Sequence, residues 1–164
     1  PLADLEGQLG AMCDMVEEGL VDNVGVSNFD EKRLRRARSL ASEPILTDQV
    51  QFHPFKPQRP LLRYCQDNDV ILTAYSPLGH GGVLRDELLN EIGNRYGKSP
   101  AQVALRWAVQ HKNVVAIPKS TTPDHIRANA EIFDFSMTEG ELDRIARKSS
   151  LKTGMSFVRG RLGV

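Results

Sequence analysis

Four apolar, β-branched runs alternate with helical patterns along the chain, and each run ends in polar residues. Nearly continuous Val, Ile and Leu is typical of strands that are buried on both faces of a parallel sheet. The polar clusters fall at residues 25–28, 48–51, 74–79 and 117–120. In repeated β-then-α units, ligands bind beyond the carboxyl ends of the strands. The pattern therefore predicts that these clusters belong to one site and are not core filling.

The same pattern predicts a parallel α/β fold. Local signals mark several helices: Ser99 with Pro100 is a cap followed by a first-turn proline, and Thr138 with Glu141 forms a capping box. Because helix alternates with strand, each strand connection should be a right-handed crossover. Helices are expected over residues 5–16, 30–40, 58–68, 87–96, 99–110, 122–130 and 138–148, and strands over 21–26, 45–52, 70–75 and 113–117.

The number of β/α units sets the expected architecture. A closed (β/α)8 TIM barrel needs roughly 250 residues, whereas this chain has 164 residues. We expect residues 1–150 to form about half of such a barrel and residues 151–164 to form a weakly patterned tail. Half a barrel would leave two unpaired strand edges and one uncovered apolar face, so we do not expect a free monomer. The chain begins with Pro1 inside a helical pattern, which predicts a piece of a longer protein.

Charge and cysteine content indicate which binding partners and which cellular compartment to expect. There are 21 Lys plus Arg and 21 Asp plus Glu, so no overall basic field favours nucleic acid or a membrane. The basic run at residues 32–36 is interpreted as a solvated helix face. Cys13 and Cys65 lie in helical patterns without metal-binding or redox spacing, which favours a reduced, cytoplasmic protein without a metal. No stretch has the length of a membrane span, and no signal peptide is visible.

Five motifs in register carry a family resemblance. They are Gly-Val-Ser-Asn-Phe at 25–29, Gln-Val-Gln-Phe-His-Pro at 49–54, Ala-Tyr-Ser-Pro-Leu-Gly at 74–79, Leu-Arg-Trp at 105–107 and Ile-Pro-Lys-Ser at 117–120. Together they closely resemble the aldo-keto reductase superfamily, in order and spacing, over about residues 5–145. The resemblance implies a (β/α)8 barrel that binds NADP(H) without a Rossmann fold. This chain would supply strands five to eight and the helix before them, and the missing N-terminal half would be its partner.

The strand ends carry groups suited to a nicotinamide. A nicotinamide needs a flat platform and a set of amide-matching groups. Tyr75 can supply the platform by stacking, and Ser27, Asn28 and Gln49 offer the donors and acceptors of a carboxamide partner. The resemblance implies the same roles. The alternatives are that Ser27 and Asn28 only cap the next helix, that Gln49 is a satisfied core amide, and that Tyr75 is ordinary strand packing.

Two further segments are suited to phosphates. Small residues from 76 to 82 leave backbone N–H groups open to a pyrophosphate just before a helix; the candidates are Ser76, Leu78, Gly79 and His80. A 2′-phosphate needs cationic and hydroxyl donors. Lys119, Ser120 and Thr121 can supply them, although Lys119 could also be a solvated lysine, and the resemblance implies that Asn129 contacts the adenine.

One departure from the family pattern affects cofactor choice. His125 stands where the family usually has a phosphate-binding arginine, and Arg127 should face elsewhere on the same short helix. A neutral imidazole is a poorer partner for a phosphate dianion than a guanidinium fork. We therefore expect NADP(H) to bind, with NAD(H) as a second cofactor.

The catalytic residues implied by the resemblance do not map onto this chain. The family uses a tyrosine acid, a lysine–aspartate pair and a histidine, all from the first half of the barrel. Here Tyr64 is interpreted as helix surface, Tyr75 as the platform and Tyr96 as a helix end, while His53 is interpreted as structural and Trp107 as core. The intact protein would then reduce an aldehyde or ketone with NAD(P)H, and this chain alone would be inactive.

Two other functions stay open at this point. The chain could belong to a regulatory subunit that binds a nicotinamide nucleotide with little catalysis. Alternatively, truncated half-barrels could pair as a dimer to cover their edges. The carbonyl substrate and the oligomeric state are not determined by the sequence.

Overall fold

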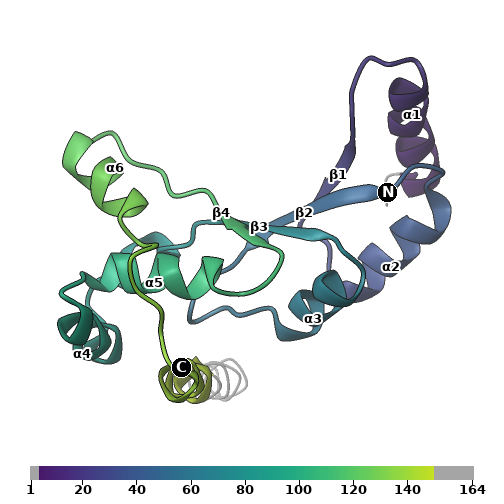
Figure 1. Cartoon of the computed structure of the whole chain (residues 1–164). Coiled ribbons are helices and arrows are strands. Elements are labelled where there is room, and N and C mark those ends of the chain that lie inside the picture. Colours follow the sequence, from purple (N-terminus) through teal and green to yellow (C-terminus); the bar gives the residue numbers. More distant parts are fainter. Residues whose placement is uncertain (1–3, 150–164) are drawn as a thin grey trace, which may run out of the picture.

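The computed structural model describes residues 4–149, which are built around one parallel sheet (Figure 1). Four described strands pair in the order β1-β2-β3-β4. They are β1 (Val24–Ser27), β2 (Ile45–Gln51), β3 (Ile71–Tyr75) and β4 (Val114–Ala116). All three pairings are parallel, so the predicted parallel α/β fold is confirmed.

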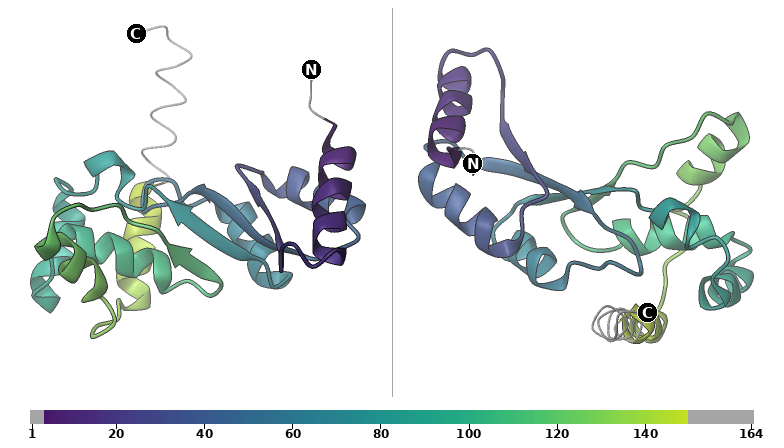
Figure 2. Two further views of the ribbon diagram at one scale, coloured as in Figure 1. Left: turned by 90° about the horizontal axis from the view of Figure 1, so that it is seen from above. Right: turned by 180° about the vertical axis from the view of Figure 1, so that it is seen from behind.

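Helices join the strands and cover one face of the sheet. In Figures 1 and 2, α2, α3 and α5 lie on the same side of the strands, α1 lies beside α2, and α6 stands on an arm beyond β4. The α4 helix packs against α5. The bounds are α1 (Leu5–Glu17), α2 (Glu31–Leu40), α3 (Arg59–Asp67), α4 (Glu87–Tyr96), α5 (Pro100–Val109) and α6 (Pro123–Ala130), with a 3-10 turn η1 (Gly79–Gly81); residues 139–149 are also helical.

The helix ends follow the local signals in the sequence. Asp30 caps α2 by accepting the Arg33 N–H at 2.7 Å. Ser99 and Gln102 form a reciprocal capping box at the start of α5, and Gly97 ends α4 in the left-handed region at φ 65°. The first strand is shorter than expected, because ladder pairing with β2 begins only at Val24. Val21, which we expected at the strand start, is 43% exposed.

The helix-covered face of the sheet forms the core. Partner residues on this face include Val26 and Leu72, and both flank Asp48. The ring of Phe52 stacks on Trp107 with centroids 4.9 Å apart, and both side chains are buried, which confirms Trp107 as core. Among the described residues, no helix combines the length and the apolar character needed to cross a bilayer.

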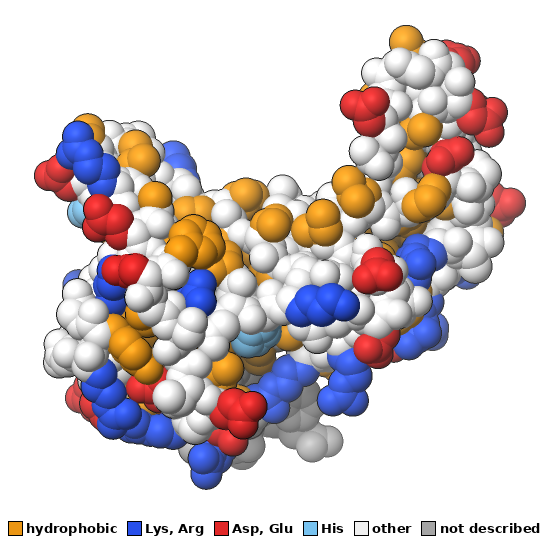
Figure 3. Space-filling model, in the orientation of Figure 1, with side chains coloured by type: hydrophobic (Ala, Val, Ile, Leu, Met, Phe, Trp, Pro, Cys, Tyr) orange, Lys and Arg blue, Asp and Glu red, His pale blue; other side chains and the backbone are white. Residues whose placement is uncertain are grey.

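The opposite face of the sheet differs from the expectation of an uncovered apolar face. Its central row holds Ser27, Gln49, Thr73 and Val115. The row is mainly polar because it runs into the ends of the strands, where ligand-binding groups are expected. Figure 3 shows a concave surface between the arm of α6 and the arm of α1, with apolar side chains along its edge. Among the described strands, β1 and β4 form the two edges.

The prediction for Tyr64 is wrong. We expected a tyrosine on the helix surface, but its side chain is only 6% exposed. The guanidinium of Arg35 lies over the ring at 4.1 Å, and the Arg38 guanidinium donates to the phenol oxygen at 2.9 Å. Two arginines from the neighbouring helix therefore cover a ring that would otherwise face water.

Candidate functional site

Hydrogen bonds join residues at the ends of the first three strands. The Ser27 hydroxyl donates to the main-chain carbonyl of Gln49 at 2.9 Å, and the Tyr75 hydroxyl donates to Asn28 Oδ1 at 2.9 Å. Asn28 Nδ2 donates to Ser27 Oγ at 3.2 Å. We call Ser27, Asn28, Gln49 and Tyr75 the strand-end cluster. The structure thus brings together four residues that the sequence predicted for one site.

The geometry decides between several alternatives for this cluster. Asp30 and not Ser27 or Asn28 caps α2, so the capping interpretation is wrong. Gln49 is exposed, so it is not a satisfied core amide. Tyr75 is half-buried, and its hydroxyl donates to Asn28, which holds the end of the ring near the first strand. Asn28 itself has φ 58°, a left-handed conformation that asparagine tolerates better than most residues.

The glycine-containing loop after β3 is a tight turn. Gly79 N–H donates to the Ser76 carbonyl at 2.9 Å, and Ser76, Gly79 and His80 have φ values of 47°, 54° and 52°. The helix expected after this loop, over residues 87–96, is present as α4. The 3-10 turn η1 lies between β3 and this helix, and the pyrophosphate contact of the loop stays a prediction.

The His53 side chain packs against this loop. A Cβ atom added to Gly79 would lie 3.2 Å from two ring atoms of His53, so the ring packs directly against the loop backbone. His53 Nδ1 accepts the Phe55 N–H at 3.3 Å. Burial, with the nearby Lys56 and His80 charges, lowers the pKa of His53 to about 4. A neutral, buried imidazole fits the structural role that was predicted for it.

A separate pocket of about 420 Å³ lies beyond β4, between α5 and α6. It contains five predicted cofactor residues: Leu78, Lys119, Ser120, His125 and Asn129. Its other lining residues, which the sequence did not predict, are Leu84, Ser99, Ala101, Gln102 and Ala128. The predicted residues Gly79, His80 and Thr121 are not among those that line this pocket.

Gln102 builds one wall of this pocket. Its amide donates to the carbonyls of Ala128 and Glu131, each at 3.1 Å, and so ties α6 to α5. The capping motif that begins at Ser99 was the available signal for this residue. Leu84, which is 51% exposed, carried no signal in the sequence. Arg127 pairs with Asp124 at 3.0 Å and does not line the pocket, as expected.

Asp48 lies behind the strand-end cluster, on the buried side of the sheet. The sequence grouped it with the polar strand end, but its side chain is fully buried. Oδ1 accepts the Phe29 N–H at 3.4 Å, while Oδ2 has no hydrogen-bond partner in the described part of the chain. Burial raises the pKa of Asp48 to about 6, against the smaller effects of Phe29 and Arg33.

Comparisons with known proteins agree with this arrangement. The model of the aldo/keto reductase family matches residues 1–150. The chain belongs to this family. It is 39% identical over 145 residues to the uncharacterized oxidoreductase YtbE of Bacillus subtilis, covering 88% of this chain and 51% of that protein. It is also 39% identical over 135 residues to glyoxal reductase of Bacillus subtilis, covering 82% and 49% respectively.

Solved structures of aldo/keto reductases have the same fold. The thermostable aldo-keto reductase Tm1743 superposes with a TM-score of 0.82 at 39% identity, over 88% of this chain and 55% of that chain. The chain spans about half the length of the curated relatives it matches. The sheet and its helices therefore correspond to part of the (β/α)8 barrel of this family.

The residues present fit a nicotinamide dinucleotide at two places. At the strand ends, the hydrogen bond to Asn28 holds the Tyr75 ring, and the exposed Gln49 amide engages no partner among the described residues. In the pocket beyond β4, the Lys119 ammonium and the Ser120 hydroxyl suit a phosphate, while Leu78 adds apolar wall. An amide for the carboxamide, an aromatic ring for stacking and a cation for a phosphate are groups that suit such a cofactor.

Proposed function

We propose that the full-length protein is an NAD(P)H-dependent oxidoreductase that reduces small aldehydes or ketones to alcohols. In this proposal the chain supplies the cofactor-binding part of the barrel. The remaining part supplies the tyrosine acid, the lysine–aspartate pair and the histidine that the family resemblance implies. The names of the oxidoreductase and glyoxal reductase relatives support this class of reaction.

One observation carries the proposal: the strand-end cluster lies on the uncovered face of the sheet. Ser27 and Gln49 occupy one row of this face, and Tyr75 is held by Asn28 at the same end. Side chains on this face point into the interior of a completed barrel, where ligands meet the carboxyl ends of the strands. A planar, amide-bearing ligand suits this arrangement, because it can stack on the Tyr75 ring and bond the exposed Gln49 amide at the same time.

The residues of this chain would bind and orient, without transferring protons. When bound, the cofactor supplies the hydride. Tyr75 would stack on the nicotinamide and leave the opposite ring face toward the carbonyl substrate. Asn28 and Gln49 would bond its carboxamide and fix its rotation. Lys119 and Ser120 would hold the phosphate of the adenosine end by charge-assisted hydrogen bonds.

The test measures cofactor binding and turnover in the full-length protein. Gln49→Ala and Lys119→Met should each weaken NADPH binding by about tenfold, since each removes one polar partner of the cofactor. Lys112→Met is the matched control, because Lys112 is exposed and lies outside both sites. Fluorescence titration with NADPH gives the dissociation constants, and a panel of aldehydes and ketones gives turnover.

Two results would contradict the proposal. If the full-length protein oxidises no NADPH with any carbonyl of the panel, the proposed reaction is wrong. If the Gln49→Ala and Lys119→Met proteins bind NADPH as tightly as Lys112→Met does, the proposed cofactor site is wrong. The 164-residue chain alone should show no turnover, because a positioned acid is worth several powers of ten in rate.

A further inference from the structure

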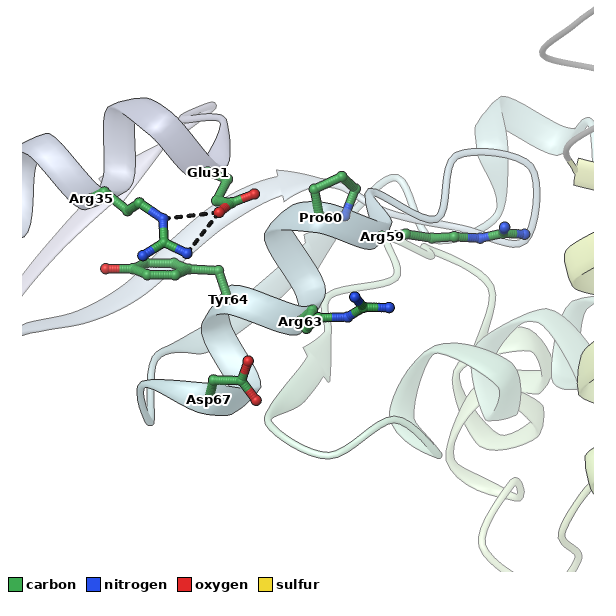
Figure 4. Close-up of a pocket in the computed structure, with 7 residues that line it drawn as sticks. All are labelled: Glu31, Arg35, Arg59, Pro60, Arg63, Tyr64 and Asp67. Carbon is green, nitrogen blue, oxygen red and sulfur yellow. Dashed lines mark hydrogen bonds and ion pairs between the residues drawn. The ribbon is translucent and has the colours of Figure 1, made fainter.

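A second pocket lies between α2 and α3, in the helix layer of the fold (Figure 4). Its volume is about 300 Å³, at the lower end of the range for small-molecule sites. We call it the α2–α3 pocket. It is lined by Glu31, Arg35, Arg59, Pro60, Arg63, Tyr64 and Asp67.

One wall of the α2–α3 pocket is already organised. Arg35 pairs with Glu31 at 2.8 Å, and its guanidinium lies over the Tyr64 ring at 4.1 Å. Figure 4 shows these three side chains on the same side of α3. The charges of this pair cancel, so the wall offers a fixed polar surface with little net charge.

The face of α3 itself carries cations without acidic partners. Arg59 and Arg63 stand four residues apart and extend to the same side of the helix in Figure 4. Like charges at this spacing destabilise a helix by a few tenths of a kcal/mol. Among residues 4–149, Arg59 donates to a neutral group, the Ala146 main-chain carbonyl, at 2.6 Å and has no acidic partner. Arg63 has no hydrogen bond or ion pair within the described residues, and it does not pair with Asp67 four residues later.

The lining of the pocket carries a net positive charge in a chain whose formal net charge is zero. Among the described residues at the pocket, Arg35, Arg59 and Arg63 face two carboxylates, Glu31 and Asp67. A fourth guanidinium, Arg38, donates only to the neutral Tyr64 hydroxyl and Asn68 amide oxygen. The lining residues therefore carry an excess of one positive charge, and Arg38, which lies behind Tyr64 and outside the lining, adds a second one nearby.

The pocket is separate from the strand-end cluster. Its lining residues come from α2 and α3, which lie on the helix-covered side of the sheet (Figure 1), whereas Ser27 and Gln49 lie in the row of the opposite face. The α2 helix contacts α1 on one side and α3 on the other, and Arg59 reaches the helical residues 139–149. Strands that complete a barrel would add to the edges at β1 and β4, away from this pocket.

We propose that the α2–α3 pocket binds a small organic phosphate, a phosphate monoester on a hydroxylated carbon chain. Arg59 and Arg63 hold the dianionic phosphate, since guanidinium groups match phosphate oxygens with paired hydrogen bonds. Asp67, which forms no ion pair among the described residues, accepts a hydroxyl of the same ligand. The site is distinct from the cofactor site and does not rest on the proposed oxidoreductase function.

The experiment uses the full-length protein with Lys119→Met, which weakens phosphate binding at the cofactor pocket, and the amide shifts in α2 and α3 report on the α2–α3 pocket separately. The probes are inorganic phosphate, glycerol 3-phosphate and glycerol, and binding is followed by calorimetry and by amide NMR shifts in α2 and α3. Arg63→Gln should weaken glycerol 3-phosphate binding by roughly tenfold. The matched control Arg36→Gln removes an equal charge from α2 outside the lining and should change the affinity less than about twofold.

Asp67→Asn tests whether Asp67 binds the hydroxylated end of the ligand while the arginines bind the phosphate end. It should reduce the preference for glycerol 3-phosphate over inorganic phosphate while leaving inorganic phosphate bound. Glycerol should not bind. The proposal is overturned if no phosphate probe shifts the α2 and α3 amides, or if Arg63→Gln and Arg36→Gln weaken binding equally, which would indicate diffuse surface attraction. Thermal unfolding confirms that each variant is folded, and Arg63 is exposed, so its replacement should leave the fold intact.

Discussion

Replacing Asp48 by asparagine should stabilise the protein at neutral pH. Asp48 is fully buried, and its Oδ2 has no hydrogen-bond partner in the described residues. Burial raises the pKa of this carboxyl from 3.8 to about 6. An acid with a raised folded pKa destabilises the fold wherever it is ionised, because the unfolded chain holds the charge at lower cost.

The size of the effect follows from this difference in pKa. A difference of about two pH units corresponds to about 3 kcal/mol, which is an upper bound on the cost of the buried charge. Asparagine keeps an oxygen for the Phe29 N–H but places an amide N–H₂ where Oδ2 lies unpartnered. Leaving that amide unsatisfied costs about 1–2 kcal/mol. The expected net gain for Asp48→Asn is therefore about 1–2 kcal/mol above pH 7.

The sign of the pH dependence is fixed by the same numbers. The cost of Asp48 is complete above pH 6 and disappears as the pH falls from about 6 to 3.8. His53 acts in the opposite direction over nearly the same range. The pKa of His53 in the folded protein, about 4, lies below its ordinary value of 6.5 because the ring is buried. The unfolded chain therefore binds the proton first, and stability falls as the pH drops from 6.5 to about 4. Because the two effects offset each other, only the difference between Asp48→Asn and wild type isolates Asp48.

The assay is urea unfolding of the full-length protein from pH 4.5 to pH 8. The stability difference between Asp48→Asn and wild type should shrink or reverse as the pH falls below 6. Asp22→Asn is the matched control, since Asp22 is exposed, and it should stay within about 0.5 kcal/mol at every pH. A difference for Asp48→Asn that does not vary with pH, or a less stable variant at pH 8, would refute the reasoning.

Two further predictions concern the cofactor. In the full-length protein, Tyr75→Ala should weaken NADPH binding by about 1–3 kcal/mol through loss of a stacked ring, whereas Tyr75→Phe should lose less because only the bond to Asn28 disappears; unchanged titrations for both would mean that Tyr75 is packing. His125→Arg should tighten NADPH by about fivefold, since an exposed pair gains about 1 kcal/mol, and should leave NADH nearly unchanged. Equal effects on NADPH and NADH would show that residue 125 does not contact the 2′-phosphate. A gain in NADPH affinity that does not change with salt concentration would show the same.

The features that could be predicted from the sequence are local ones. Asp30, Ser99 and Gly97 mark helix ends through bonds within a few residues, and each of them acts in that way in the structure. The strand-end cluster could be predicted because parallel strands place their carboxyl ends together. Its four members come from three strands that are adjacent in the sheet, so the strand order was enough to join them.

The features that could not be predicted depend on contacts between distant segments. Asp48 is polar like its neighbours at the strand ends, but side chains alternate between the two faces of a strand, and the side chain of Asp48 points into the core. Tyr64 is buried by two arginines from α2. They lie too far from it in the sequence for a helical or strand repeat to indicate the contact. Leu84 lines the pocket beyond β4 through the path of the loop after η1, which carries no repeating pattern. Predicting each of these positions would require knowing how the helices and loops pack against the sheet.

The all-parallel order of the sheet has a consequence for how the protein folds. No described strand pairs with its neighbour through a hairpin, and η1, α4 and α5 lie between β3 and β4 along the chain. Every strand pairing must therefore close a long loop before its hydrogen bonds compensate for the lost chain entropy. During synthesis, β1, β2 and β3 leave the ribosome well before β4, and the edge of β3 stays open throughout that interval. Such a chain should fold slowly and depend on chaperones to keep that edge from pairing with other molecules.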